Sequence, residues 1–156
     1  MNILKAEAFA NRRGTVLDTF MFADPGHSLE LNPSEIDRLR ATIERVILGK
    51  QDVKQLLQNR PKPAAPSRKS QIEGRVSFDP DASNTATLIQ IIAQDRPGLL
   101  YDLTAAISGQ GCNIEVVLID TEAHKAIDVF YVTAGGRKLT AERQASLASA
   151  LREACG

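Results

Sequence analysis

Hydrophobic residues along the chain follow two spacings, one typical of strands and one typical of helices. Residues 16–22 (VLDTFMF) and 126–132 (AIDVFYV) are apolar, extended segments in which an aspartate is followed two positions later by a phenylalanine. Residues 87–93 form a short run of leucine and isoleucine bounded by polar residues, which favours a buried strand over a helix. The pattern therefore predicts at least three strands.

The two aspartate-containing segments belong to a longer internal repeat. Upstream of them, Asn2-Ile3 corresponds to Asn113-Ile114, and a turn at residues 11–14 or 122–125 follows in each copy. Downstream, each copy passes through a glycine-containing loop into an amphipathic segment. The repeat predicts one full module at the C-terminal end and only the latter half of a first module before it.

The first module is predicted to end in a helix with a clear start. Asn32 offers an N-cap, Pro33 suits the first helical position, and Glu35 is placed for a capping box. The helix is expected to stop near Gly49, and a further short helix is expected around Val53, Leu56 and Leu57. The apolar face of the longer helix, which begins after Asn32, consists of Ile36, Leu39, Ile43, Val46 and Ile47.

Two more helices are predicted in the second module. The first begins at Leu99, has apolar residues at helical spacing and ends at residues 109–111, where two glycines stand. The second is capped by Thr140, and its buried stripe is expected to be small, so that the helix lies close to a sheet. That stripe is Ala145, Ala148, Leu151 and Ala154.

From residue 86 the order is strand, helix, strand, strand, helix, which predicts an α+β sandwich of the ferredoxin-like class with both helices on one face of an antiparallel sheet. Such a unit normally ends in a fourth strand beside the first. Here residues 75–79, with Val76 and Phe78 alternating, are predicted to fold back antiparallel to residues 87–93 and to take that place.

Composition divides the chain into three parts. Residues 60–70 (RPKPAAPSRKS) hold three prolines and four cations and nothing apolar larger than alanine, which is typical of a linker. The predicted organisation is a partial first module over residues 1–59 (two strands, a helix and the short helix), a Pro-rich basic linker over 60–74, and the second, complete domain over 75–156.

Charge and cysteine content exclude several classes of function. The 19 Lys and Arg residues balance 19 Asp and Glu residues, so the cationic surplus that nucleic-acid binding requires is missing. No apolar run approaches the roughly 20 residues that cross a membrane, and no signal peptide precedes the first module, so a cytoplasmic protein is expected. Cys112, Cys155, His27 and His124 show no metal-ligand spacing, and neither a metal nor a cofactor is expected.

The candidate chemistry lies in the loop over residues 95–100 (DRPGLL), between a strand and a helix. Free amides and the positive end of the helix dipole are expected there, and Gly98 lets a ligand approach the backbone. Pro97 fixes the entry to the helix, and Asp95 offers an acceptor for an ammonium group. These features suit a free amino acid. The alternative is that Pro97 and Gly98 only punctuate the helix and Asp95 caps it.

Residues 93–103 (AQDRPGLLYDL) and 126–133 (AIDVFYVT), in this order of elements, resemble the ACT domain family of small-molecule-sensing modules. More specifically, together with residues 75–79 and Ala82-Ser83, they are similar to the tandem ACT domains at the C-terminus of bacterial protein-PII uridylyltransferases, the uridylyl-transferring and uridylyl-removing sensors of nitrogen metabolism.

The resemblance implies an effector site between paired modules, built from the strand-to-helix loop and the start of the following strand, with glutamine as the effector. Carried over to this sequence, the ligand-binding residues are Asp95, Arg96, Pro97, Gly98, Leu99, Leu100, Cys112, Asn113 and Ile114. The family's nucleotidyltransferase and hydrolase motifs have no counterpart here, so this chain is expected to be a regulatory module without catalytic residues.

Other interpretations stay open. The chain is alternatively a stand-alone ACT protein that dimerises without a ligand. Because the first module starts at its second strand, Met1 is expected to be an internal start, the edge of a fragment or a misassigned start. A half module leaves strand edges uncovered, which predicts a homodimer or contact with missing catalytic domains through residues 1–48.

Asp18 and Asp128 are expected to face solvent, and Cys112 to be a small buried residue.

Overall fold

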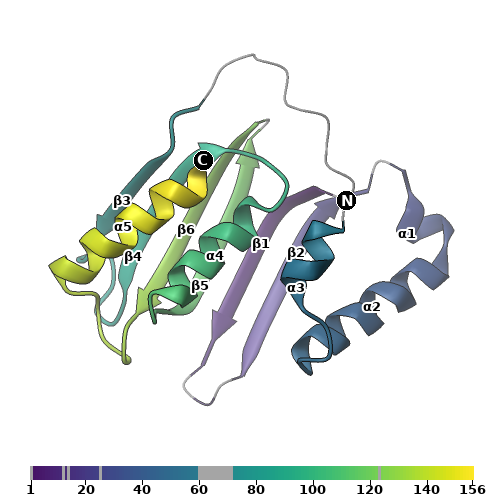
Figure 1. The fold of residues 1–156 in the computed structure, drawn as a ribbon, viewed down its shortest axis with the longest axis horizontal. Coiled ribbons are helices and arrows are strands. Elements are labelled where there is room, and N and C mark those ends of the chain that lie inside the picture. Colours follow the sequence, from purple (N-terminus) through teal and green to yellow (C-terminus); the bar gives the residue numbers. More distant parts are fainter. Residues whose placement is uncertain (1, 12, 14, 25, 60–71, 123) are drawn as a thin grey trace. The chain divides into compact units, whose positions relative to one another are not determined.

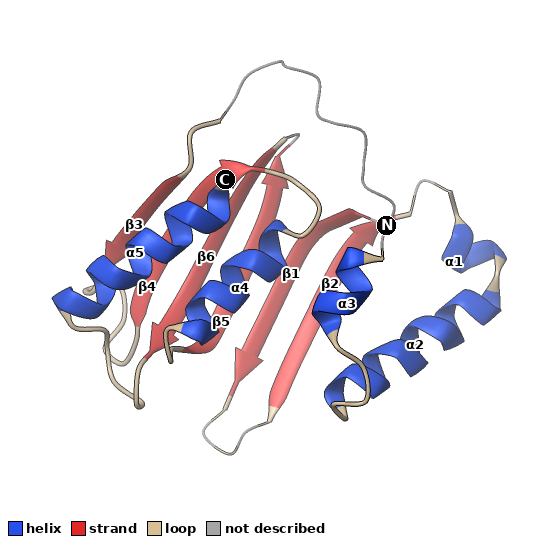
Figure 2. Ribbon diagram, viewed as in Figure 1, coloured by secondary structure: helices blue, strands red, loops and turns tan. Residues whose placement is uncertain are grey.

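The computed structural model describes residues 2–11, 13, 15–24, 26–59, 72–122 and 124–156. Helices and strands follow the predicted order, with a short additional helix, α1, before the first long one (Figures 1 and 2). The elements are β1 (Asn2–Ala10), β2 (Val16–Ala23), α1 (Ser28–Leu31), α2 (Pro33–Ile47), α3 (Val53–Gln58), β3 (Arg75–Asp79), β4 (Thr87–Gln94), α4 (Leu99–Gly109), β5 (Asn113–Glu122), β6 (Lys125–Thr133) and α5 (Ala141–Cys155).

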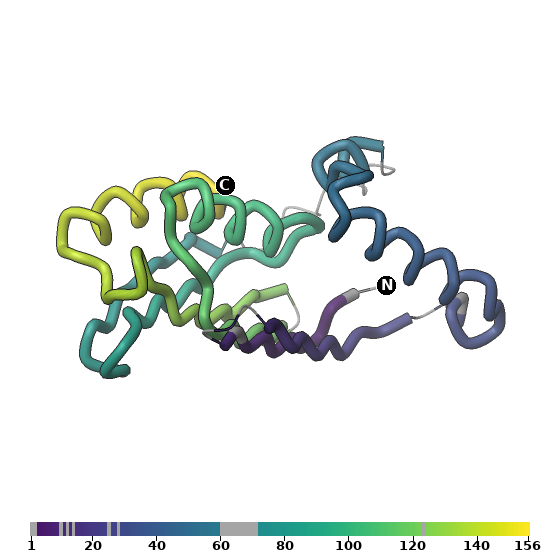
Figure 3. Tube along the Cα trace, turned by 90° about the horizontal axis from the view of Figure 1, so that it is seen from below, coloured from purple at the N-terminus to yellow at the C-terminus, as the bar shows by residue number. Residues whose placement is uncertain are grey.

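A single six-stranded sheet has the order β2-β1-β5-β6-β4-β3. Helices α4 and α5 lie on the same side of it (Figure 3) and pack against each other, α4 over β5 and α5 over β3. The predicted α+β, ferredoxin-like ACT fold is confirmed. Strand β3 pairs antiparallel with β4, with Val76 opposite Ile91 and Phe78 opposite Ile89, as expected for a substitute fourth strand.

The core lies between the sheet and these two helices. Strand alternation directs every second residue of β4 and β6 toward the helices, among them Ile89, Ile91, Phe130 and Val132. Helix α4 contributes Leu99, Leu103 and Ile107 to the same core, and α5 contributes Leu147 and Leu151. These side chains are almost completely removed from water, so they supply most of the apolar burial that stabilises the second module.

The inward face of α5 differs from the predicted stripe of small residues. Leu147, Ala148 and Leu151 are buried, Ala154 is half-buried, and Ala145 is exposed. Leu147 and Leu151 are one turn apart and reach deepest into the core, which turns Ala145 away from the sheet. The prediction was correct for Ala148 and Leu151 and wrong for Ala145.

The chain divides into two compact units, residues 1–2 with 23–67 and residues 3–22 with 68–156. Helices α1, α2 and α3 belong to the first unit, and the sheet with α4 and α5 belongs to the second. The predicted linker over 60–74 falls mostly on residues 60–71, which lie outside the described residues. The two strands of the half module thus share a sheet with the complete module.

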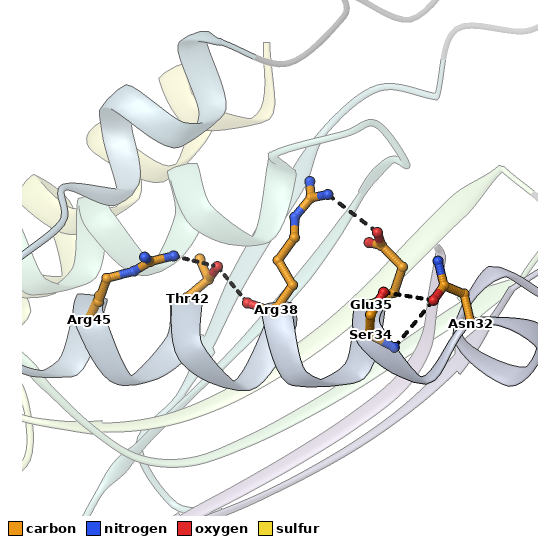
Figure 4. Close-up of polar contacts among 6 residues, drawn as sticks. All are labelled: Asn32, Ser34, Glu35, Arg38, Thr42 and Arg45. Atoms are coloured by element: carbon orange, nitrogen blue, oxygen red, sulfur yellow. Dashed lines mark hydrogen bonds and ion pairs between the residues drawn. The ribbon is translucent and has the colours of Figure 1, made fainter.

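Within the first unit, α2 begins at the predicted cap. Asn32 Oδ1 accepts hydrogen bonds from the Ser34 amide at 3.2 Å and from Ser34 Oγ at 2.7 Å (Figure 4). Glu35 pairs with Arg38 at 3.3 Å, so it does not complete a capping box. Along the helix, Thr42 donates to the Arg38 carbonyl and Arg45 donates to Thr42. The predicted apolar stripe is present on this helix, but Ile43 and Ile47 are exposed.

Gly74 lets the chain enter β3 directly beneath the end of α5. A Cβ placed on Gly74 would lie 2.8 Å from Cys155 Cβ, closer than two such atoms approach. We expect Gly74→Ala to lower the free energy of unfolding by about 1–3 kcal/mol, because one of the two backbones must shift. Gly109→Ala is the control: a Cβ there meets nothing within 4 Å, and alanine in a helix is expected to stabilise by about 0.5–1 kcal/mol. Chemical denaturation measures both, and equal effects at the two positions would contradict the close approach.

Candidate functional site

The loop after β4 has the backbone geometry that the sequence predicts. The Asp95 amide donates to the His124 carbonyl at 2.8 Å, which fixes the loop to the β5–β6 hairpin. Gly98 is the N-cap of α4 with φ of +88°, a left-handed conformation that favours glycine, and no side chain caps the helix. Asp95 therefore does not cap the helix. Of the residues in the alternative interpretation, Gly98 is the one that marks the start of α4.

The N-terminus of α4 leaves backbone donors available. The Leu99 amide donates to the Arg96 carbonyl at 3.1 Å, and the first helical hydrogen bond runs from the Asp102 amide to the Gly98 carbonyl at 3.0 Å. The amides of Leu100 and Tyr101 precede that bond, and their N–H groups point out of the N-terminal end of the helix. An anionic group at this end would be favoured by both the amides and the helix dipole.

Arg96 fastens the loop to the other helix. Its Nη2 lies 2.7 Å from Asp102 Oδ2 on α4 and donates to the Ala154 carbonyl, at the end of α5, also at 2.7 Å. A cation at a helix C-terminus satisfies carbonyls that have no partner within the helix. Of the predicted ligand residues, Arg96 is thus already engaged within the protein.

The second half of the predicted site lies elsewhere in the module. Strand β5 begins at Asn113, which pairs with Thr133 at the end of β6, whereas Asp95 is bonded to His124 just before β6 begins. The length of β6 separates them, about 26 Å at 3.3 Å per residue. Asn113 donates to Glu115 at 3.0 Å, Cys112 is buried, and burial raises the pKa of its thiol against the opposing effect of Arg143. Within one module, the two groups of residues are not brought together.

The pairing of β1 with β5 relates these two strands by a local two-fold axis. Since Asn2 aligns with Asn113, Glu7 aligns with Leu118, and the sheet pairs these two residues with each other. On either side, Lys5 is opposite Asp120 and Phe9 is opposite Val116, and each of these pairs is the repeat image of the other. Equivalent strands of the two repeats therefore pair antiparallel with each other, with Glu7 and Leu118 at the centre of the pairing.

The direction of β1 places its start at the same end of the sheet as the Asp95 loop. Strand β1 runs antiparallel to β5, with Lys5 opposite Asp120, so β1 begins at the sheet end where Asp95 is bonded to His124, and β5 and β6 lie between β1 and β4. We name the loop over residues 95–100 together with residues 3–5 of β1 the seam site. Cys112, Asn113 and Ile114 lie at the opposite end, beside the end of β1, where the loop of a complete first module would stand.

Asp128 is a residue of this region that the sequence analysis misplaced. It is only 2% exposed, and its Oδ1 has no hydrogen-bond partner among the described residues. Burial, and secondarily the charge of Asp95, raises its pKa from 3.8 to about 7. The expectation of a solvent-facing strand residue is wrong, because Asp128 has the same parity as Ala126, Phe130 and Val132, which all face the helices. That shared parity was the signal in the sequence. Its repeat counterpart, Asp18, is exposed as expected.

Cys155 at the end of α5 completes a cluster of ionisable groups beneath the loop. Its pKa is raised chiefly by burial, lowered by Arg96 and raised further by Asp128. We call Asp95, Arg96, Asp128 and Cys155 the Asp128 cluster. Its two carboxylates lie near each other, while the cation among them is bonded to Asp102 and Ala154.

Other kinds of site receive little support. In the described part of the chain, no three His, Cys, Asp or Glu side chains are grouped so as to hold a metal ion. A cavity of about 540 Å³ in the first unit is lined by Arg45, Gly49, Lys50, Gln51, Asp52 and Gln55, none of which is a predicted site residue. None of the described helices has the length and apolar character of a membrane span.

The raised pKa of Asp128 predicts a pH-dependent stability. Below its ordinary value of 3.8 the carboxyl is protonated in both the folded and the unfolded chain, and above about 7 the folded chain bears the cost of a buried charge. Its contribution to stability is therefore present at low pH and lost as pH rises through that window, by up to about 1.4 kcal/mol per pH unit. We expect Asp128→Asn to stabilise the protein relative to wild type at pH 8 and much less at pH 4. Denaturant unfolding across this range measures the difference, Asp18→Asn is the control, and a constant difference at all pH values would contradict the assignment.

Comparison with known proteins accords with this geometry. Residues 75–155 match the family model described as "ACR9-like, ACT-like domain". A protein of Azospirillum brasilense called "Bifunctional uridylyltransferase/uridylyl-removing enzyme" is 37% identical over 147 residues, and proteins of the same name from Bradyrhizobium sp. strains ORS 278 and BTAi1 are each 34% identical over 152 residues. The alignments cover 92% and 96% of this chain but only 16% of the length of these relatives. No solved structure matches with comparable significance. With more than half of its residues matched by that model, the chain belongs to the ACT-like domain family.

Proposed function

We propose that this chain is an amino-acid-sensing module, that glutamine is its effector, and that the effector binds at the seam site. The observation that carries the proposal is the open N-terminus of α4 behind Gly98, at the sheet end where β1 of the other repeat begins. The two-fold relation between β1 and β5 supports a site between modules, as the resemblance to ACT domains implies.

The carboxylate and the ammonium group of a free amino acid each have a matching group at the seam site. The ligand carboxylate is placed at the amides of Leu100 and Tyr101, where the helix dipole favours an anion. Asp95 accepts from the ammonium group. The absence of a side chain at Gly98 lets the ligand approach the backbone, and Pro97 restricts the loop. Cys112, Asn113 and Ile114 would form part of a second, symmetry-related site that needs the loop of a complete first module.

Sensing in this proposal requires no chemistry from the chain. A ligand that contacts both the loop and the start of β1 stabilises the paired arrangement of the two repeats by its difference in affinity between paired and unpaired states. From the names of its relatives, we infer that this module serves a uridylyltransferase or uridylyl-removing enzyme, whose catalytic domains are not part of residues 1–156. The module would then report the level of an amino acid to those domains.

Titration with L-glutamine and the other amino acids by calorimetry tests this function. We expect saturable binding of glutamine and an upward thermal shift. Asp95→Asn is expected to weaken binding by about tenfold or more, since it removes the charge that accepts from the ammonium group. Asp81→Asn, which removes an exposed carboxylate in the β3–β4 loop, is the matched control and should bind as wild type does. A lack of heat and of thermal shift with every amino acid would leave no support for sensing.

A second candidate function is association without a ligand, and the outer edge of β2 favours it. No strand among the described residues pairs with this edge, and the strand holds neither lysine nor proline, residues that commonly protect edges. Val16, Leu17, Phe20 and Met21 are each at least half exposed. An apolar edge of this kind favours pairing with a second copy of the chain.

Light scattering over a dilution series tests association. We expect a dimer or larger species in the wild type and a monomer in the double variant Leu17→Lys, Met21→Lys, because two charges on one face of β2 oppose edge pairing. Ser149→Lys on α5, the helix over β3 at the other end of the sheet from β2, adds an exposed charge within the same unit and serves as the control. A wild type that stays monomeric at every concentration rules out this second function.

A further inference from the structure

The guanidinium of Arg96 lies where the Asp95 loop, α4 and α5 meet. Its Nη2 is 2.7 Å from Asp102 Oδ2 in the first turn of α4 and donates to the Ala154 carbonyl near the end of α5, also at 2.7 Å. Its Nη1 is 4.0 Å from the position that a Cβ on Gly98 would occupy. One side chain therefore lies beside the glycine that opens α4 and is bonded to the last turn of the other helix.

The two bonds of Arg96 serve position more than stability. The side chains of Arg96 and Asp102 are 38% and 41% exposed, so water screens their ion pair, and such pairs add little to the stability of a fold. The bond to the Ala154 carbonyl is, among the described residues, the one side-chain hydrogen bond that joins the loop to α5. Its main consequence is that the place of the loop depends on the place of the end of α5.

The end of α5 is in turn packed against the residues that lead into β3. A Cβ on Gly74 would lie only 2.8 Å from Cys155 Cβ, so the two backbones approach closely here. Ala154, Cys155 and Val76 are partly buried against the core, and α5 contacts β3. Arg96 and Gly74 thus contact adjacent residues of one helical turn, and a shift of that turn changes both contacts.

We propose that Arg96 is a positioning residue of the seam site and couples ligand binding there to the packing of α5 on Gly74. This inference rests on the proposed function. While Arg96 is bonded to the Ala154 carbonyl, the loop is held with the amides of Leu100 and Tyr101 toward the ligand carboxylate. When the end of α5 shifts, the loop loses this support and the ligand binds less tightly. A bound ligand therefore favours the bonded arrangement by the difference between its two affinities.

The coupling acts in both directions. A ligand that favours the bonded arrangement stabilises the end of α5, and a change that loosens this end weakens the ligand by the same factor. A substitution at Gly74 is therefore expected to lower the affinity, although Gly74 is outside the seam site. Residues 72–74 are the last of the predicted linker over 60–74, so this route carries the effect of the ligand to that linker.

Calorimetric titration with L-glutamine tests the role of Arg96. Arg96→Gln removes the charge and the fork of donors, and we expect it to weaken binding by about tenfold. Arg96→Lys keeps a charged donor and should restore part of the affinity. Arg152→Gln, which removes an exposed cation from the last turn of α5, is the matched control and should bind as wild type does. Equal affinities of Arg96→Gln and Arg152→Gln overturn the inference.

A double-mutant cycle separates positioning from a general loss of stability. We expect Gly74→Ala to lower the affinity by about threefold or more when Arg96 is present and to have no effect in the Arg96→Gln background, because Arg96 makes the connection. A purely structural role predicts the same effect in both backgrounds. The same effect in both, or none when Arg96 is present, overturns the inference and leaves the proposed function intact.

Hydrogen exchange of the wild type with and without L-glutamine requires no variant to fold. We expect slower exchange in the bound protein at residues 98–103, and also at 152–156 and 72–76. Protection confined to 98–103 overturns the inference while glutamine binding itself stands. A chain that binds no amino acid overturns the proposed function and the inference with it.

Discussion

The backbone pairing of β1 with β5 is the interaction on which the rest of this molecule depends. It joins the strands of residues 2–23 to the sheet of residues 75–133 through backbone hydrogen bonds, and its register is centred on Glu7 and Leu118. Because these residues occupy the same position in the two repeats, the pairing imposes a local two-fold axis. The axis in turn places the start of β1 at the sheet end where the Asp95 loop is anchored.

The loop over residues 95–100 is anchored to both helices and still leaves the N-terminal amides of α4 without a side-chain cap. Gly98 adopts a left-handed conformation and opens α4 without a side-chain cap, while Arg96 donates to the Ala154 carbonyl near the end of α5. The loop is thus held at both helices while the helix end remains open. On β6, Asp128 is buried, its Oδ1 has no hydrogen-bond partner among the described residues, and burial raises its pKa to about 7.

The elements were largely predictable, and the side-chain environments were not. The cap at Asn32, the substitution of β3 for a fourth strand and the helix after Gly98 all followed from local signals, because capping, alternation and backbone restriction act over a few residues. Ala145 was misplaced because burial depends on what packs opposite a residue, whereas Asp128 was misplaced although it shares the strand parity of Phe130 and Val132, which are buried. The grouping of Cys112 to Ile114 with the Asp95 loop also needed the sheet register, since the two lie at opposite ends of one module.

The amino-acid sequence by itself determined the repeat, the ferredoxin-like order of elements and the motif around Pro97 and Gly98, since these depend on local conformational preference and on periodicity. Only the tertiary structure decided that β1 and β5 pair about equivalent residues, that Arg96 is bonded to α5 and that the Asp95 loop is bonded to the β5–β6 hairpin. Each of these facts joins residues far apart in the chain, and their contacts depend on strand register and helix packing, which no short stretch of sequence specifies.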